Sequence, residues 1–323
     1  MRKKNSRIPC ITKENVIYYL ISVNSHNSGD DRNMYHYAIS IGTLRILNQE
    51  WCEALAASKF KRIELSCGEF LSPAEIEQMA ERIFNNSCLQ NIEIASVHLP
   101  FCPFERFPYL AGEKERNAIA QYLETFIRLT AQLGAPHYTY HASIEPVPQE
   151  ERASLLEATR PVVERLAQAA AESNASLNVE LLPRSCIGNC TEELKELLKG
   201  IPPEKAGICF DVNHLGGTPE RVPEFINELD GRIRSLHLSD YDGIDEAHWL
   251  PGLGVLNWPA VMQTIRSLPG NPLLVLETAQ VRPHSGRPRE ITPELHFHQV
   301  ERAVFYLENC DEIESRIAAS VLP

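Results

Sequence analysis

The feature of this sequence that most constrains its fold is a regular alternation of short apolar runs with longer amphipathic stretches. The alternation begins near Tyr37 and continues almost to the end of the chain. Each short run has about the length of a buried strand. The eight runs are Ala38–Leu44, Arg62–Ser66, Ile92–His98, His137–His141, Ser176–Leu181, Gly207–Asp211, Ile233–Leu238 and Leu273–Thr278. Continuous rather than alternating hydrophobicity is typical of a parallel sheet that is buried on both faces.

The stretches between these runs are predicted to be helices. Ala118–Leu133 and Leu155–Ala171 repeat apolar residues at spacings of three and four, which places them on one helical face. Ser72 followed by Pro73 is the expected order of an N-cap and a first helical residue. Thr191, which two glutamates follow, is predicted to be another N-cap. Further helices are predicted over residues 73–84, 219–229, 258–267 and 293–307.

Eight strands separated by helices indicate an α/β fold, either a doubly wound sheet or a closed (β/α)₈ barrel. The count of eight favours the TIM barrel, and 323 residues suit one large barrel with extensions. We predict a single barrel domain over residues 36–323 and a partly irregular N-terminal extension over residues 1–35. The extension is not predicted to be a secretory signal, because polar residues separate its basic start from the apolar run at 16–23 and no small-residue cleavage site follows.

Six successive predicted strands end in a histidine, an aspartate or a glutamate. In a barrel these ends meet at one rim, where active sites are built. The residues are His98, His141, Glu180, Asp211 (with His214 three positions later), His237 and Glu277. Several carboxylates that converge without a cation would repel one another and be costly to desolvate, and Arg and Lys are nearly absent from these strand ends. A mixed set of imidazoles and carboxylates suits Mn²⁺, Zn²⁺, Co²⁺ or Fe²⁺ better than Ca²⁺, so the sequence predicts a divalent metal site.

In their order and strand placement, these residues resemble the xylose isomerase-like barrel superfamily of sugar (phosphate) isomerases and epimerases. The resemblance runs from about Tyr37 to Cys310. Its marks are Val179-Glu180, Phe210-Asp211-Val212-Asn213-His214, Leu236-His237-Leu238, the stretch from His248 to Gly254, and Leu276-Glu277. No single mark is specific, and the resemblance depends on all of them together.

The resemblance implies one divalent metal ion (Mn, Co, Mg or Zn) held by Glu180, Asp211, His237 and Glu277. It further implies that Glu180 and Glu277 are an acid/base pair. One would remove the proton from the carbon beside the carbonyl of a small-molecule sugar, or sugar phosphate, to give an enediolate, and the other would return a proton.

The same resemblance implies substrate-binding residues around the metal, namely His98, His141, His214 and His248. In such epimerases an arginine often follows the histidine of strand seven, but here Ser239-Asp240-Tyr241-Asp242-Gly243 takes its place. Arg184 is therefore a further candidate for the contact with an anionic or hydroxyl group of the substrate.

Endonuclease IV-type apurinic-site nucleases, which use three zinc ions, belong to the same superfamily and give a rival interpretation. Their ligand pattern can be traced here as His98, His141, Glu180, Asp211, His214, His237, Glu246, His248 and Glu277. The net charge of −12 and the lack of a basic or aromatic loop for gripping DNA argue against it, so no nucleic-acid partner is expected. A lyase or dehydratase acting on oxidised sugars, and a barrel that needs a second chain, remain open alternatives.

Other features concern the setting of the protein. No apolar run approaches the roughly 18 residues of a membrane helix, so no membrane partner is expected. The nine cysteines are scattered without a CxxC pair, which favours reduced thiols and a cytoplasmic location. The sequence leaves the oligomeric state open, a homo-oligomer included. Cys209 is expected to be an inert core thiol, and His284, His296 and His298 are expected to be surface groups.

Overall fold

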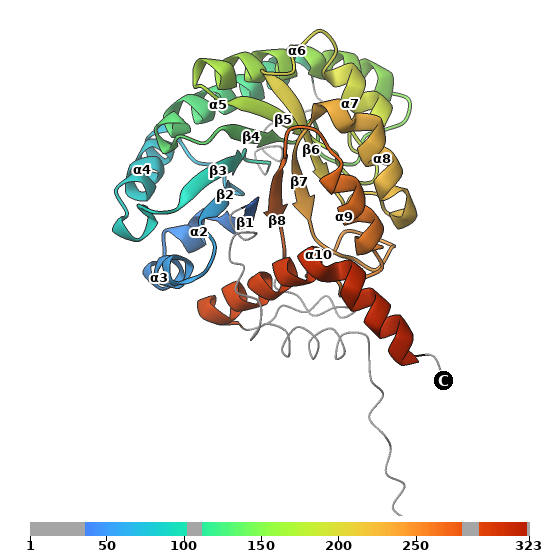
Figure 1. Cartoon of the computed structure of the whole chain (residues 1–323). Coiled ribbons are helices and arrows are strands. Elements are labelled where there is room, and N and C mark those ends of the chain that lie inside the picture. The colour runs from blue at the N-terminus through green and yellow to red at the C-terminus, as the bar shows by residue number, and fades with distance from the viewer. Residues whose placement is uncertain (1–35, 102–111, 280–290, 322–323) are drawn as a thin grey trace, which may run out of the picture.

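Eight parallel strands close into a barrel in the computed structural model, which describes residues 36–101, 112–279 and 291–321 (Figure 1). The strands follow one another around the barrel in sequence order. They are β1 (Tyr37–Gly42), β2 (Arg62–Ser66), β3 (Glu93–His98), β4 (His137–Tyr140), β5 (Ser176–Glu180), β6 (Ala206–Asp211), β7 (Ile233–Leu238) and β8 (Leu273–Leu276). The first and last strands pair with each other, with Ile39 opposite Leu276. The predicted TIM barrel is confirmed, whereas the predicted extension at 1–35 and His284 lie outside the described residues.

The helices form a ring outside the strands (Figure 1). They are α2 (Thr43–Ile46), α3 (Gln49–Ala57), α4 (Pro73–Phe84), α5 (Glu113–Thr130), α6 (Arg152–Glu172), α7 (Thr191–Leu197), α8 (Val222–Leu229), α9 (Trp258–Arg266) and α10 (Pro293–Val321). The last of them, α10, is kinked at Asn309 and packs against α3 and α9. A right-handed βα repeat returns each strand to the same direction, so every carboxyl end lies at one face of the barrel.

Two predicted helix starts had different outcomes. Ser72 caps α4 as predicted: its hydroxyl accepts a hydrogen bond from the Glu75 amide, and the Glu75 carboxylate accepts one from the Ser72 amide. The prediction for Thr191 is wrong, because the N-cap of α7 is Cys190 and Thr191 is the first helical residue. The Thr191 hydroxyl donates instead to Glu228 of α8, so it joins two neighbouring helices.

The main hydrophobic core lies between the outer face of the strands and the helices. Successive side chains of a strand point to opposite faces, so the residues that alternate with this core point into the barrel. A separate small cluster of Ala38, Ala95, Leu273 and Val275 lies there. Other inward positions carry buried polar side chains, namely Glu64, Ser96, Thr139, Asn178 and Ser235. Among the described residues no helix has both the length and the apolarity that a membrane span requires.

Candidate metal centre

Every strand from β3 to β8 brings an ionisable side chain to the carboxyl face of the barrel. His98, Glu180 and Asp211 are the last residues of β3, β5 and β6. His141 and Glu277 directly follow β4 and β8. On the remaining strand, β7, His237 is the residue before the last. The structure therefore gathers the predicted strand-end set at one site.

Four of these residues form a compact group at the centre. Glu180, Asp211, His237 and Glu277 each offer one ligand atom, and these four atoms lie within 4.8 Å of one another. His237 Nδ1 is 2.9 Å from Glu277 Oε2, 3.4 Å from Glu180 Oε1 and 3.8 Å from Asp211 Oδ2. Asp211 and His237 are partners in the β6–β7 register, which explains why they lie at the same depth. Three of the side chains are almost fully buried, whereas Glu277 is 24% exposed.

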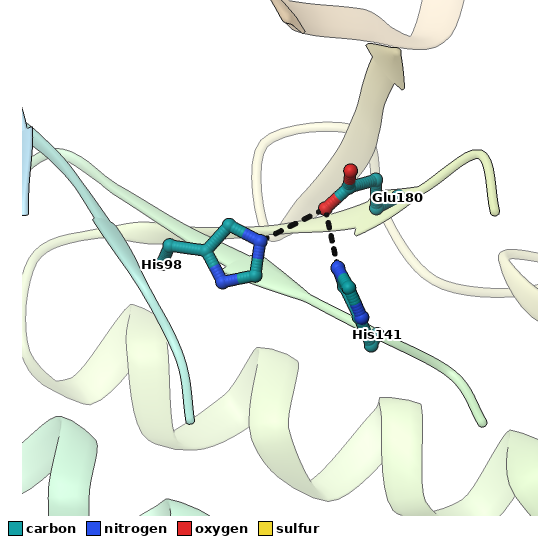
Figure 2. A group of neighbouring side chains, drawn as sticks. All are labelled: His98, His141 and Glu180. Carbon is teal, nitrogen blue, oxygen red and sulfur yellow. Dashed lines mark hydrogen bonds and ion pairs between the residues drawn. The ribbon is translucent and has the colours of Figure 1, made fainter. Parts of the chain in front are cut away.

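A second group consists of His98, His141 and Glu180, and it shares Glu180 with the first. Figure 2 shows both histidines directed at the Glu180 carboxylate. Nε2 of His98 and Nε2 of His141 lie 3.1 and 2.9 Å from the same oxygen, Glu180 Oε2. The other oxygen of Glu180 faces His237. Phe101 stacks against the His141 ring at 5.3 Å between centroids and gives this side of the site an apolar wall.

A third group forms where the loop after β7 folds back over the rim. His248 Nε2 lies 2.9 Å from Glu246 Oε1, and His214 Nε2 lies 3.6 Å from the same oxygen. His214 Nε2 is also 3.4 Å from Asp211 Oδ2, which connects this group to the central one. Asp211, His214 and His248 offer ligand atoms within 4.8 Å of one another.

The backbone fixes which ring nitrogen several of these histidines direct at the carboxylates. A carbonyl oxygen can only accept, so the Nδ1 of His98 donates to Leu99 and the Nδ1 of His214 donates to Leu181. When either ring is neutral, the other nitrogen, Nε2, carries the lone pair, and in both residues it faces a carboxylate. Two electron-rich atoms held this close require a positive charge between them, either a proton or a metal ion.

The pKa values of the site residues also indicate that the site favours positive charge. Burial disfavours the charged imidazoles, but neighbouring carboxylates outweigh it. They raise the pKa of His98 to about 9, that of His214 to about 10 and that of His248 to about 9. Burial likewise opposes ionisation of Glu277, yet His237 lowers the pKa of that carboxyl below its usual value. Two groups are exceptions: burial raises the pKa of Asp211 to about 6, and burial lowers the pKa of His141 below its usual value.

The donor set fits a divalent metal. Among the described residues, Asp211 Oδ2, His214 Nε2 and His237 Nδ1 are buried and have no hydrogen-bond partner. Buried polar atoms are rarely left without one, and these three lie close together, with His214 Nε2 and His237 Nδ1 at 3.4 and 3.8 Å from Asp211 Oδ2. A mixed set of imidazole nitrogens and carboxylate oxygens suits Zn²⁺, Mn²⁺ or Co²⁺.

One buried carboxylate in contact with the site was missed from the sequence. Glu64, in the middle of β2, is fully buried, and its Oε2 lies 3.2 Å from His237 Nε2. Burial disfavours its ionised form, but the His237 ring outweighs burial and lowers the pKa of Glu64. The signal was present, because an ionisable residue between Ile63 and Leu65 of a predicted buried strand must point into the barrel.

Arg184 lies at the rim, outside the three groups. Its guanidinium pairs with Glu145 at 2.6 Å, with Asp245 at 2.6 Å and with Glu246 at 3.2 Å. The predicted substrate contact of Arg184 therefore competes with three carboxylates, and through Glu246 the arginine is connected to His248.

The expectations for the remaining residues had mixed outcomes. Cys209 is fully buried, and burial raises the pKa of its thiol to about 12, but it borders the central group: its ligand atom lies within 4.8 Å of those of Glu180 and His237. The prediction of an exposed His298 is confirmed. The prediction for His296 is wrong, because that ring is buried against Trp51 and Phe297 at the interface of α3 and α10. The His296 ring packs against aromatic side chains, whereas the sequence had led us to expect it to face solvent.

Comparison with known proteins places this geometry among related chains. A family model described as xylose isomerase-like TIM barrel matches residues 52–298. An uncharacterized protein of Methanocaldococcus jannaschii is 23% identical over 237 residues, which cover 71% of this chain and 78% of that protein.

Solved structures with the same fold include sugar epimerases. A D-tagatose 3-epimerase-like protein matches with a TM-score of 0.64 and 22% identity over 88% of this chain and all of that one. D-psicose 3-epimerase from Clostridium cellulolyticum matches with a TM-score of 0.62 and 15% identity over 84% and 98% of the two chains. A Thermus thermophilus protein, from a crystal soaked with ZnCl₂, matches with a TM-score of 0.58 and 23% identity over 84% and 96%. At these low sequence identities, the similarity to the solved structures establishes the shared fold alone.

Proposed function

The chain belongs to the xylose isomerase-like TIM barrel family, and from that premise we propose that it is a metal-dependent isomerase or epimerase of sugars or sugar phosphates. The observation that carries the proposal is the central group, in which Glu180, Asp211, His237 and Glu277 offer ligand atoms within 4.8 Å of one another. The epimerases among the solved structures support the sugar as substrate class.

In this proposal the two glutamates move the proton. When bound, a divalent ion would polarise the carbonyl and neighbouring hydroxyl of the sugar as a Lewis acid. Glu277 is the more accessible carboxylate, and its lowered pKa keeps it ionised, as a general base must be. It would take the proton from the carbon beside the carbonyl to leave an enediolate. Glu180 would return a proton to the opposite face or to the neighbouring carbon.

The remaining rim residues would bind and orient the sugar. His98, His141, His214 and His248 would each contact a sugar hydroxyl by exchanging a carboxylate neighbour for it, and Phe101 would cover an apolar face of the ring. Arg184 would contact the substrate only by exchanging one of its three carboxylate partners.

The test follows deuterium from solvent into the substrate. Metal-loaded protein in D₂O is offered ketoses, aldoses and their phosphates, and NMR monitors exchange at the carbon beside the carbonyl. Exchange with a rearranged sugar as product supports the proposal, whereas an unsaturated or cleaved product identifies a lyase or dehydratase. Glu277→Gln should lower the rate by at least about 100-fold, the usual worth of a general base.

The control for that variant is Glu93→Gln, which makes the same chemical change at the amino end of β3. Glu93 is half-exposed and pairs with Arg62, away from the site. It should keep full activity. Equal rates in the two variants would contradict the role of Glu277.

A specific observation favours a second candidate function, a hydrolase of phosphate esters with three zinc ions. Both oxygens of Glu180 are engaged, one by His98 and His141 and the other by His237, which leaves no free oxygen for proton transfer. His214, Glu246 and His248 converge in a further group. All nine residues of the endonuclease IV-type pattern are thus gathered at one face of the barrel.

The metal content separates the two candidates. One tightly bound metal ion per chain, measured by mass spectrometry after zinc loading, supports the isomerase or epimerase. Three per chain, with incision of an oligonucleotide that contains an abasic site, support the hydrolase. In the hydrolase the double variant His98→Ala, His141→Ala would lower the count from three to two, whereas in the isomerase it would leave one ion in place.

We also place the protein in the cytoplasm. Each of the seven described cysteines is a free thiol, as a reducing compartment favours. A protein recovered from the periplasm or the medium with its thiols oxidised would contradict this location.

A further inference from the structure

Glu64 makes a contact that crosses the interior of the barrel. It is fully buried in β2, and its Oε2 lies 3.2 Å from Nε2 of His237 in β7. Strands β2 and β7 are not neighbours in the sheet, so the contact spans the barrel interior rather than a strand pair. It lies on the side of the His237 ring away from the central group.

This contact determines which nitrogen of His237 is free. An ionised carboxylate can only accept a hydrogen bond, so Nε2 carries the proton and donates it to Glu64. In the neutral ring the lone pair is then on Nδ1, the atom that faces Glu277 Oε2 at 2.9 Å and Glu180 Oε1 at 3.4 Å. A metal-binding histidine needs this arrangement, with one nitrogen held by a hydrogen bond and the other free.

We propose that Glu64 is a positioning residue that fixes the tautomer and orientation of His237 for metal binding. The inference rests on the metal site of the proposed function, but it does not depend on which reaction the site performs. Glu64 itself does not touch the substrate. It would act only through His237.

The surroundings of Glu64 support a role of this kind. The Thr139 hydroxyl donates to Oε2 at 3.3 Å, and Ser96 lies 3.4 Å from Thr139, so a short polar chain supports the carboxylate. Its second oxygen, Oε1, is buried without a hydrogen-bond partner among the described residues. Barrel interiors are usually filled by bulky aliphatic side chains, and a buried carboxylate is a costly replacement for one. If this position had only a structural role, leucine would fill it at a lower energetic cost.

The experiment compares Glu64→Leu, Glu64→Gln and the control Asn178→Leu. Asn178 is equally buried in the same barrel interior, but its amide donates to Ser235 rather than to His237. Zinc affinity is measured by competition with a chelator, and thermal denaturation of the metal-free proteins shows that each is folded. We expect Glu64→Leu to bind zinc about 10–100-fold more weakly than the unmodified chain. The glutamine keeps an accepting oxygen and should lose less, and Asn178→Leu should bind as the unmodified chain does.

A second measurement detects the protonation and metal binding of the His237 ring nitrogens directly. In zinc-loaded protein with ¹⁵N-labelled histidine, NMR should show His237 bound through Nδ1 and protonated at Nε2. This measurement needs no variant, so it remains decisive if Glu64→Leu fails to fold. Binding through Nε2, or unchanged zinc affinity in both Glu64 variants, would overturn the inference.

The result also separates this inference from the proposed function. Zinc binding that depends on Glu64, without turnover of any sugar, would support the positioning role and count against the isomerase or epimerase. A chain that binds no divalent metal would contradict both.

Discussion

The imidazoles at the barrel mouth present ring nitrogens to carboxylates rather than to water. His98 and His141 meet Glu180, and His248 meets Glu246. Without a metal ion, protons supply positive charge at His98 and His248, where neighbouring carboxylates raise the pKa, whereas burial lowers the pKa of His141. A metal ion bound at this site would have to displace those protons, so protons and metal would compete for the same atoms.

The pH dependence of stability should therefore differ between the metal-free and metal-loaded protein. In the metal-free fold the pKa values of His98 and His248 are raised to about 9, above about 6.5 in the unfolded chain. Their stabilisation is fully present below pH 6.5 and is lost as the pH rises through about 9. The melting temperature of the metal-free protein should fall from pH 6.5 to pH 8.5, and the stabilisation by zinc should grow over the same range. Parallel curves for the two forms would show that these histidines do not bind the ion.

Sequence reasoning identified the site residues that lie at strand ends. It failed for residues whose burial or role depends on contacts that are distant in the sequence. His98, Glu180 and His237 were identifiable because parallel strands end together. Glu64 was missed because it lies in mid-strand, and its partner His237 is far away in the sequence. The burial of His296 depends on Trp51, which is distant in the sequence although its helix, α3, packs against α10, and no local pattern indicates such a contact.

At the scale of elements, the loop from β7 to α9 is held by one buried carboxylate. Asp240 accepts hydrogen bonds from the amides of Gly252 and Leu256 and from the Trp258 indole. The glycines allow the chain to pass this close, and a Cβ on Gly254 would lie 2.1 Å from the Tyr241 carbonyl oxygen. The stretch from His248 to Gly254, which contributed to the family resemblance, therefore has mainly a structural role. It also positions His248 at the site.

Gly254→Ala should consequently destabilise the protein. The added methyl group must displace backbone, which costs on the order of 2 kcal/mol or more, a shift of several degrees in melting temperature. The matched control is Gly42→Ala at the end of β1, where a Cβ meets nothing within 4 Å and the backbone has φ −68° and ψ 150°. Thermal denaturation in the presence of a chelator measures both. A Gly254→Ala protein as stable as the control would contradict the tight packing of this loop.

The element boundaries show what periodicity can and cannot predict. The strands Arg62–Ser66 and Ile233–Leu238 were predicted with their observed bounds. In both, apolar residues alternate with polar ones, and the polar residues Glu64, Ser235 and His237 are buried in the barrel interior. Helix α10 continues well beyond the predicted 307, to Val321, past the kink at Asn309. Its later turns are less apolar, and the contacts that keep them helical are not visible in a local pattern.

At the scale of the whole molecule, the central group connects four strands that follow one another around the barrel, β5 to β8. An ion bound there would hold the last four strands of the closed sheet to one another. Ligands that bind only the folded state stabilise it by mass action, by about 2.7 kcal/mol when free metal is 100 times the dissociation constant.

Zinc or manganese should therefore raise the melting temperature by several degrees in a concentration-dependent way. The double variant Glu180→Gln, Glu277→Gln removes two of the four carboxylate and imidazole ligands and should abolish the shift. The double variant Glu93→Gln, Glu172→Gln changes two exposed glutamates and should preserve it. A shift that survives the loss of both site glutamates would place the ion elsewhere.

The closure of the barrel also determines when the site can first exist during synthesis. Glu277 follows β8, the strand that completes the ring by pairing with β1 and β7. It leaves the ribosome after Glu180, Asp211 and His237, so a growing chain displays three of these ligands while the fourth is still unmade. The complete four-residue group can therefore form only after the last strand has been translated.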